Sequence, residues 1–253
     1  MNIYLSGVIW VVGASAVAGV SAYVVRRFGQ DEGRPGNNDA AGQVFTIVAG
    51  LHAVLVAFVL IAQFDAVTQA RKGSYTEAQA LVAAAWSADS LPEPTRSQVR
   101  AHSADYASTV LDEEWPQMRA DTEVSRSGWE QLDRIQVDLA KAKADENWQE
   151  ERKTRATEAL TVVAEARQQR VQQANGDQVG AVVWFALILG SVISTLLPNL
   201  FGGTRLGTHV IIVSTLAGTI TLLLFAIYQL QNPFSGGAVV EPDAFRNALE
   251  RLR

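Results

Sequence analysis

Few residues of this chain stand in a pattern that could do chemistry, and the most suggestive ones lie in or beside one apolar stretch. His52 lies inside the uncharged stretch 40–64, and Phe58, Gln63 and Asp65 follow it. Polar groups inside membrane spans usually face a bundle interior or a water path. In a symmetric oligomer, a ring of Asp65 carboxylates would favour cations, and Phe58 could form a hydrophobic constriction. One hypothesis is therefore a pore lined by His52, Phe58, Gln63 and Asp65.

Each of these residues also has an ordinary structural interpretation. His52 could simply form a hydrogen bond to a neighbouring helix, Asp65 could be an interfacial carboxylate, and Phe58 could face lipid. If His52 instead lines a water path, permeation should depend on pH, because histidine changes its charge near neutral pH. The residue types leave both interpretations open.

No other pattern indicates catalysis or a cofactor. The acidic run Asp112-Glu113-Glu114 lacks the spacing of a calcium loop, which must supply six to eight oxygen ligands, so a solvated helix end is the better interpretation. His102 and His209 have no partner motif, and cysteine is absent. We therefore expect no catalytic residue, no cofactor and no metal site, and we expect the protein not to be an enzyme.

The pore candidates lie in or directly after one of four charge-free stretches of the chain. The stretches cover 1–25, 40–64, 178–204 and 206–240. A helix rises about 1.5 Å per residue, so roughly 20 apolar residues cross a hydrocarbon core of about 30 Å. Unpaired backbone groups are too costly in lipid for most other spanning structures. The sequence predicts an all-α, multi-pass protein of the cell membrane with four transmembrane helices.

The charge is segregated between these stretches, which defines the expected domains. The ranges are 1–64 for a first transmembrane hairpin, 65–177 for a polar helical insert, 178–234 for a second hairpin and 235–253 for a C-terminal tail. The net charge of −5 makes nucleic acid an unsuitable partner. The lipid bilayer is the expected partner, and small residues along the first span favour packing of subunits into a homo-oligomer.

The insert is expected to be a bundle of four antiparallel helices. The second span has no break after Phe64, so its helix should continue to about Trp86 as one rod. The next polar helix should close near Pro116, because proline disfavours helical geometry in the preceding residue. Asn175-Gly176 separates the last insert helix only weakly from the third span, so those two are expected to form a second rod.

Motifs in order along most of the chain resemble those of a bacterial family described as bestrophin-like, whose function is unknown. They are Asn38-Asp39-Ala-Ala-Gly42, Gly50, Ala57-Phe58, Phe64-Asp65, Glu77-Ala78, Leu91-Pro92, Tyr106, Glu114-Trp115, Trp184, Asn232-Pro-Phe-Ser-Gly236, Pro242 and Phe245. His52 and Asn232 depart from the family pattern, which more often has tyrosine and a basic residue there. Phe64-Asp65 also departs from it, since Trp-Glu is more usual.

The resemblance implies a layout similar to that of bestrophins. These are pentameric anion channels with a helical region between the second and third spans and a pore along the second. Bestrophin pore and calcium-clamp residues do not match this chain one by one, so the similarity to bestrophins themselves is architectural. A pentamer, and inorganic ions as ligands, follow by analogy only.

Two functions therefore stay open. One is an oligomeric ion channel with the second transmembrane helix lining the pore, and the other is a non-conducting sensor or scaffold whose insert binds a partner. The side of the membrane is also open. Arginines in the short loops, Arg26, Arg27, Arg34 and Arg205, favour an extracytoplasmic insert by the positive-inside rule, whereas the bestrophin layout implies a cytoplasmic one.

Overall fold

The regular structure of the described chain is entirely helical. The computed structural model describes residues 2–28, 38–176, 179–200, 205–237 and 239–253, and these contain helices and no strand. The predicted all-α class is confirmed.

The helix bounds follow the order of the chain. They are α1 Ile3–Phe28, α2 Asn38–Ala88, α3 Thr95–Thr109, the π-helical turn η2 Val110–Glu114, α4 Trp115–Arg119, α5 Ser127–Lys141, α6 Asn147–Asn175, α7 Ala181–Leu196, the 3-10 turn η3 Leu197–Leu200, α8 Leu206–Leu230 and α9 Asp243–Leu252. The expected rod after the second span is present, because α2 is one helix of 51 residues.

Four of the described helices are long and apolar enough to cross a membrane. The candidate spans are Ile3–Phe28, Gly42–Ala88, Ala181–Leu200 and Leu206–Leu230. Their large apolar side chains are extensively exposed in the protomer, as expected for surfaces in contact with lipid tails. The chain is a multi-pass membrane protein, and its arrangement as two hairpins stays a prediction.

The chain divides into two compact units. Unit 1 comprises residues 1–64 and 177–231, and unit 2 comprises residues 65–176 and 232–253. The two units use different packing chemistry, and each is described by itself.

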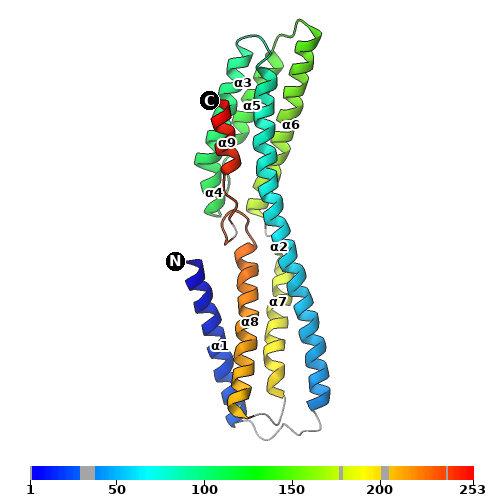
Figure 1. Ribbon diagram of the computed structural model, residues 1–253, viewed down its shortest axis with the longest axis vertical. Helices are drawn as coiled ribbons and strands as arrows, with labels where there is room; N and C mark the ends of the chain where they lie inside the picture. The colour runs from blue at the N-terminus through cyan, green and yellow to red at the C-terminus, as the bar shows by residue number, and fades with distance from the viewer. Residues whose placement is uncertain (1, 29–37, 177–178, 201–204, 238) are drawn as a thin grey trace. The chain divides into compact units, whose positions relative to one another are not determined.

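Unit 1 is built around a close antiparallel pair, α1 and α8 (Figure 1). Ser15 and Gly19 are four residues apart in α1, and Ser214 and Gly218 are four apart in α8. A Cβ on Gly19 would lie 2.5 Å from Ser214 Oγ, and a Cβ on Gly218 would lie 2.5 Å from Ser15 Oγ. Each helix thus presents a glycine to the other's serine. Such small residues let backbones approach closely where no hydrophobic effect drives association.

The α1–α8 contact gives the small residues of the first span a role inside the protomer. Beside the glycines, Ala18 and Ala22 of α1 are buried against Val213 and Ala217 of α8. On its other side α8 packs against α7, where Ile227 and Leu187 share a buried cluster with Val56 of α2.

Unit 2 contains the helices of the insert together with the C-terminal tail. Helix α3 packs against α5 and α9, and α5 packs against α6. Arg100 of α3 donates from Nε to the carbonyl of Leu252, 3.0 Å away, and Trp115 Nε1 donates to the carbonyl of Val240 at 3.3 Å. The tail is therefore part of the insert's core.

Two expectations about helix ends in unit 2 are wrong. The helix that is expected to close near Pro116 continues past it to Arg119. It passes through the π turn η2 into α4, where the Trp115 amide donates five residues back to Val110. Pro116 is tolerated there because it falls in the first turn of α4, where an amide proton is dispensable.

The second rod is interrupted. Helix α6 ends at Asn175 and α7 begins at Ala181, with Gly176 and Gly180 in extended conformations (ψ 140° and 154°). Any residue can adopt these conformations, but glycine loses more backbone entropy than other residues when it is fixed in a helix, so Gly176 and Gly180 favour a break between the two helices.

We predict that Gly19→Leu disrupts the α1–α8 contact, because the added side chain must displace Ser214. Overpacking of this kind typically costs about 1–3 kcal/mol. Gly50→Leu is a matched control in the same unit, since a Cβ there meets nothing within 4 Å. Thermal unfolding in detergent, followed by circular dichroism, should show a lower midpoint for Gly19→Leu only. Equal midpoints for the two variants would contradict the reciprocal contact.

Candidate functional site

The four candidate pore residues lie on two different faces of α2. His52 and Gln63 are buried, with 8% and 3% of their surface exposed, whereas Phe58 is 68% exposed and Asp65 is also exposed. At about 100° per residue, eleven residues bring His52 and Gln63 to nearly the same angle, and seven do the same for Phe58 and Asp65. The structure therefore places the four residues on two faces of α2 and not on one.

His52 forms a hydrogen bond to a neighbouring helix. Its Nε2 lies 3.2 Å from Ser191 Oγ of α7, and Ser191 Oγ in turn donates to the carbonyl of Leu187 at 2.6 Å. Because the shorter contact directs the hydroxyl proton of Ser191 to Leu187, the Ser191 oxygen is placed to accept a hydrogen bond from His52 Nε2. This is the contact expected of a histidine that joins two helices.

Gly190 makes room for the imidazole. A Cβ on Gly190 would lie 2.3 Å from His52 Nδ1 and 3.0 Å from Cγ, so the ring rests directly on the glycine. His52 Nδ1 and Ser194 Oγ, one turn beyond Gly190, are buried and have no hydrogen-bond partner among the described residues. A polar group without a partner inside a membrane span needs a physical explanation, either a bound water or a functional role.

Unit 2 contains a second polar cluster, at the centre of which is Arg170 of α6. Its Nε and Nη2 donate to the two carboxylate oxygens of Glu77 in α2, at 2.8 and 2.9 Å. Nη2 also donates to Glu114 of η2 at 2.7 Å. Arg170 and both carboxylates are at most 1% exposed. One guanidinium thus connects three elements of unit 2.

Arg167, one turn earlier in α6, completes the cluster. Its Nη2 donates to Glu114 Oε1 at 2.6 Å and to the carbonyl of Ser125 at 3.3 Å. Gly128 has to lack a side chain here, because a Cβ would lie 2.0 Å from that same Glu114 oxygen. Two buried arginines therefore compensate two buried glutamates, and the cluster carries no net charge.

Aromatic rings enclose the ion cluster. The Arg167 guanidinium lies 4.7 Å from the Trp129 ring centroid, and that of Arg170 lies 5.4 Å from Phe245 and 5.7 Å from Trp115. These are cation–π distances. Tyr106 donates its hydroxyl proton to Glu77 at 2.5 Å.

The enclosure fixes the charge states of the cluster. Burial, assisted by the negative charge of Glu77, raises the pKa of Tyr106 well above its usual value, so the phenol stays a neutral donor. Burial alone would lower the pKa of Arg170, but Glu77 and Glu114 outweigh that effect and raise its pKa above the usual range. Arg170 therefore remains charged.

Sequence reasoning missed this cluster. The interpretation of the acidic run as a solvated helix end is wrong for Glu114, which is buried, whereas Asp112 and Glu113 are exposed. A signal existed, because Leu160, Val163, Arg167 and Arg170 follow one another at spacings of three or four residues. The arginines continue the apolar stripe of α6, and that position predicts burial with a partner.

The cluster's chemistry is that of a structural element. Its carboxylates are both engaged by guanidinium groups, and the described residues contain no group of three or more histidine or acidic side chains suited to a metal ion. In unit 1, His52 is hydrogen-bonded to Ser191 through Nε2 and keeps only Nδ1 without a partner among the described residues, so its clearest role is to hold α2 against α7.

We predict that Arg170→Met strongly destabilises the protein, because it leaves Glu77 and Glu114 buried with too little compensation. Breaking a buried pair in this way typically costs about 3–5 kcal/mol. Arg155→Met is a matched control, since Arg155 forms an exposed pair with Glu151, and such pairs contribute about 0–1 kcal/mol. Unfolding midpoints measured in detergent should separate the two variants clearly. Similar shifts would mean that the cluster does not hold unit 2 together.

We also predict an energetic coupling between Gly190 and His52. The methyl group of Gly190→Ala has no room beside the imidazole, whereas in the double variant with His52→Ala it occupies the space that the ring leaves. The double variant should therefore lose less stability than the sum of the single variants, measured by thermal unfolding as a double-mutant cycle. Gly50→Ala, where a Cβ meets nothing within 4 Å, supplies the control pair. Additive losses would show that the two residues do not touch.

Known proteins resemble this chain in sequence family and in fold. The family model of the bestrophin-like domain matches residues 12–245. A solved structure described as that of a membrane protein is similar to this chain, with a TM-score of 0.68 and 13% sequence identity. The similarity covers 100% of this chain and 97% of the other. No curated protein sequence matches.

The structural similarity concerns the fold alone at this level of identity, whereas the family match extends over most of the chain. It includes the α2 face of His52, the ion cluster around Arg170 and the start of α9. The chain belongs to the bestrophin-like family.

Proposed function

We propose that the protein is an oligomeric ion channel in which α2 lines a pore shared by several subunits. The observation that supports this most directly is the uncovered face of α2. Val54, Phe58 and Ile61 are each more than half exposed, and Leu51 and Ile47 extend the same side of the helix. Membership of the bestrophin-like family is consistent with a channel.

Phe58 and Asp65 are the residues that would meet on the axis of such an oligomer. They share a face of α2, and residues 40–64 contain no charge, so Asp65 is the first charged side chain that an ion would meet after that stretch. A ring of phenyl groups constricts and dehydrates a pore, and a ring of carboxylates attracts cations. In this proposal His52 and Gln63 lie within the pore wall and support α2 from behind.

The decisive experiment is reconstitution of the purified protein into planar bilayers under salt gradients, over a range of pH and calcium concentration. Ionic current would establish conduction, and silence under all of these conditions would contradict the channel. Silence would instead favour the alternative, a non-conducting sensor or scaffold whose insert binds a partner.

We predict that Asp65→Asn lowers the preference for cations several-fold. Removing a ring of negative charge from the axis weakens the attraction of cations and the repulsion of anions, so the reversal potential under a KCl gradient should move toward the anion value. Glu158→Gln is the control, because it neutralises an exposed carboxylate on α6. If Asp65→Asn leaves the reversal potential unchanged, or if Glu158→Gln shifts it by the same amount, Asp65 does not line the pore.

A further inference from the structure

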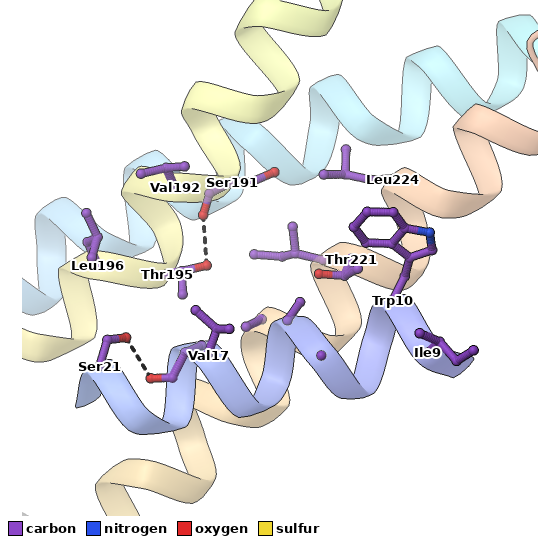
Figure 2. Close-up of a pocket in the computed structure, with 15 residues that line it drawn as sticks. Ile9, Trp10, Val17, Ser21, Ser191, Val192, Thr195, Leu196, Thr221 and Leu224 are labelled. Atoms are coloured by element: carbon purple, nitrogen blue, oxygen red, sulfur yellow. Dashed lines mark hydrogen bonds between the residues drawn. The ribbon is translucent and has the colours of Figure 1, made fainter. Parts of the chain in front are cut away.

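Unit 1 contains an apolar groove that the proposed pore does not use. It has a volume of about 650 Å³ and lies between α1 and α7, with α8 as its floor (Figure 2). Ile9 and Trp10 lie at one end of the groove and Ser21 and Leu196 at the other. Between these two ends, the α1 side of the groove is formed by the small residues Gly13 and Ala14.

The groove is suited to hydrocarbon and not to a polar solute. Three of the hydroxyl groups in its wall are used by their own helices. Ser21 donates to the carbonyl of Ala18 at 2.9 Å, Ser191 to that of Leu187 at 2.6 Å, and Thr195 to that of Ser191 at 2.8 Å. Such back-bonded hydroxyls offer little to a ligand, and the other lining residues are almost all apolar.

A second, open hollow, lined by α1 alone, continues along that helix from the groove. It has a volume of about 460 Å³, shares Val17 and Ser21 with the first and continues past Val20 to Val24. From Ile9 to Val24 the helix rises roughly 22 Å, which exceeds the roughly 15 Å of one hydrocarbon leaflet. The groove and the open hollow together are long enough along α1 to accommodate a whole acyl chain.

The groove leads toward a cation. Arg27 follows Val20 and Val24 at helical spacing, so it lies on the same face one turn beyond the end of the second hollow. Its side chain is exposed and belongs to the last turn of α1. Basic residues at the end of a transmembrane helix attract anionic lipid headgroups.

We propose that the groove binds one acyl chain of an anionic phospholipid whose phosphate pairs with Arg27. The apolar wall accounts for the chain, and the guanidinium selects the charge of the headgroup. The bilayer surrounds unit 1 with this ligand, so no other partner is required. The site is independent of ion conduction, and a non-conducting protein would bind the lipid equally well.

The test compares two glycine variants in the full-length protein. Gly13→Leu fills the groove, and Gly50→Leu adds the same side chain to the exposed face of α2. At both positions a Cβ meets nothing within 4 Å, so both variants should fold. After delipidation and addition of phosphatidylglycerol, native mass spectrometry should show one retained lipid per protomer in the wild type and in Gly50→Leu. Gly13→Leu should retain none.

Headgroup recognition is tested separately with Arg27→Gln. The preference for phosphatidylglycerol over phosphatidylcholine should fall about fivefold, the effect typical of one basic side chain near a membrane surface. An unchanged preference would overturn the assignment of Arg27.

Other outcomes would overturn the site itself. A wild-type protein that retains no lipid, or a Gly13→Leu variant that retains it as well as Gly50→Leu does, would contradict the proposal. If Gly13→Leu instead reduces the mass of the oligomer without loss of lipid, the groove is covered by a second copy of the chain.

Discussion

The packing of unit 2 depends on one constraint. The buried positive charge of Arg170 must be compensated by carboxylates. A buried guanidinium without partners costs several kcal/mol, and here it must reach Glu77 and Glu114 at the same time. These carboxylates lie on α2 and on the π turn η2, so both elements must approach α6 together. Trp115 and Phe245 can then close over the cation, which draws the C-terminal tail into the same core. The geometry of one side chain thus selects the arrangement of four segments.

Unit 1 obeys a different rule because its solvent is lipid. Burying an apolar side chain gains little when the surroundings are equally apolar, so helices associate where their backbones can approach closely. The reciprocal contacts of Gly19 with Ser214 and of Gly218 with Ser15 satisfy that condition. Gly190 applies the same principle to a polar residue, since its missing side chain admits the imidazole of His52. In unit 1, therefore, glycines have the organising role that the ion cluster has in unit 2.

This difference explains what could be predicted from the sequence. The number of spans and the continuity of α2 depend on charge-free length and on the absence of breaks, which are local properties. The burial of Glu114 depends on the π turn, and the identity of its partners depends on helices distant in the sequence. Neither is a local property. The faces of α2 could in principle be assigned from helical periodicity, but only a partner such as Ser191 shows which face is the inner one.

Helix α2 supplies a residue both to the ion cluster of unit 2 and to the histidine contact of unit 1. These residues are Glu77 and His52. Glu77 is fixed in direction by two bonds to Arg170, so the rotation of α2 about its own axis is set at that point. The side chain of His52 is held by the hydrogen bond to Ser191 and by its close packing on Gly190. These contacts set the rotation of α2 in unit 1, at a position 25 residues before Glu77. Within unit 1, Phe58 follows His52 by six residues, so the contact with Ser191 fixes the side of α2 on which Phe58 emerges. Within unit 2, Asp65 precedes Glu77 by twelve residues, and the bonds of Glu77 to Arg170 fix the side of Asp65 in the same way.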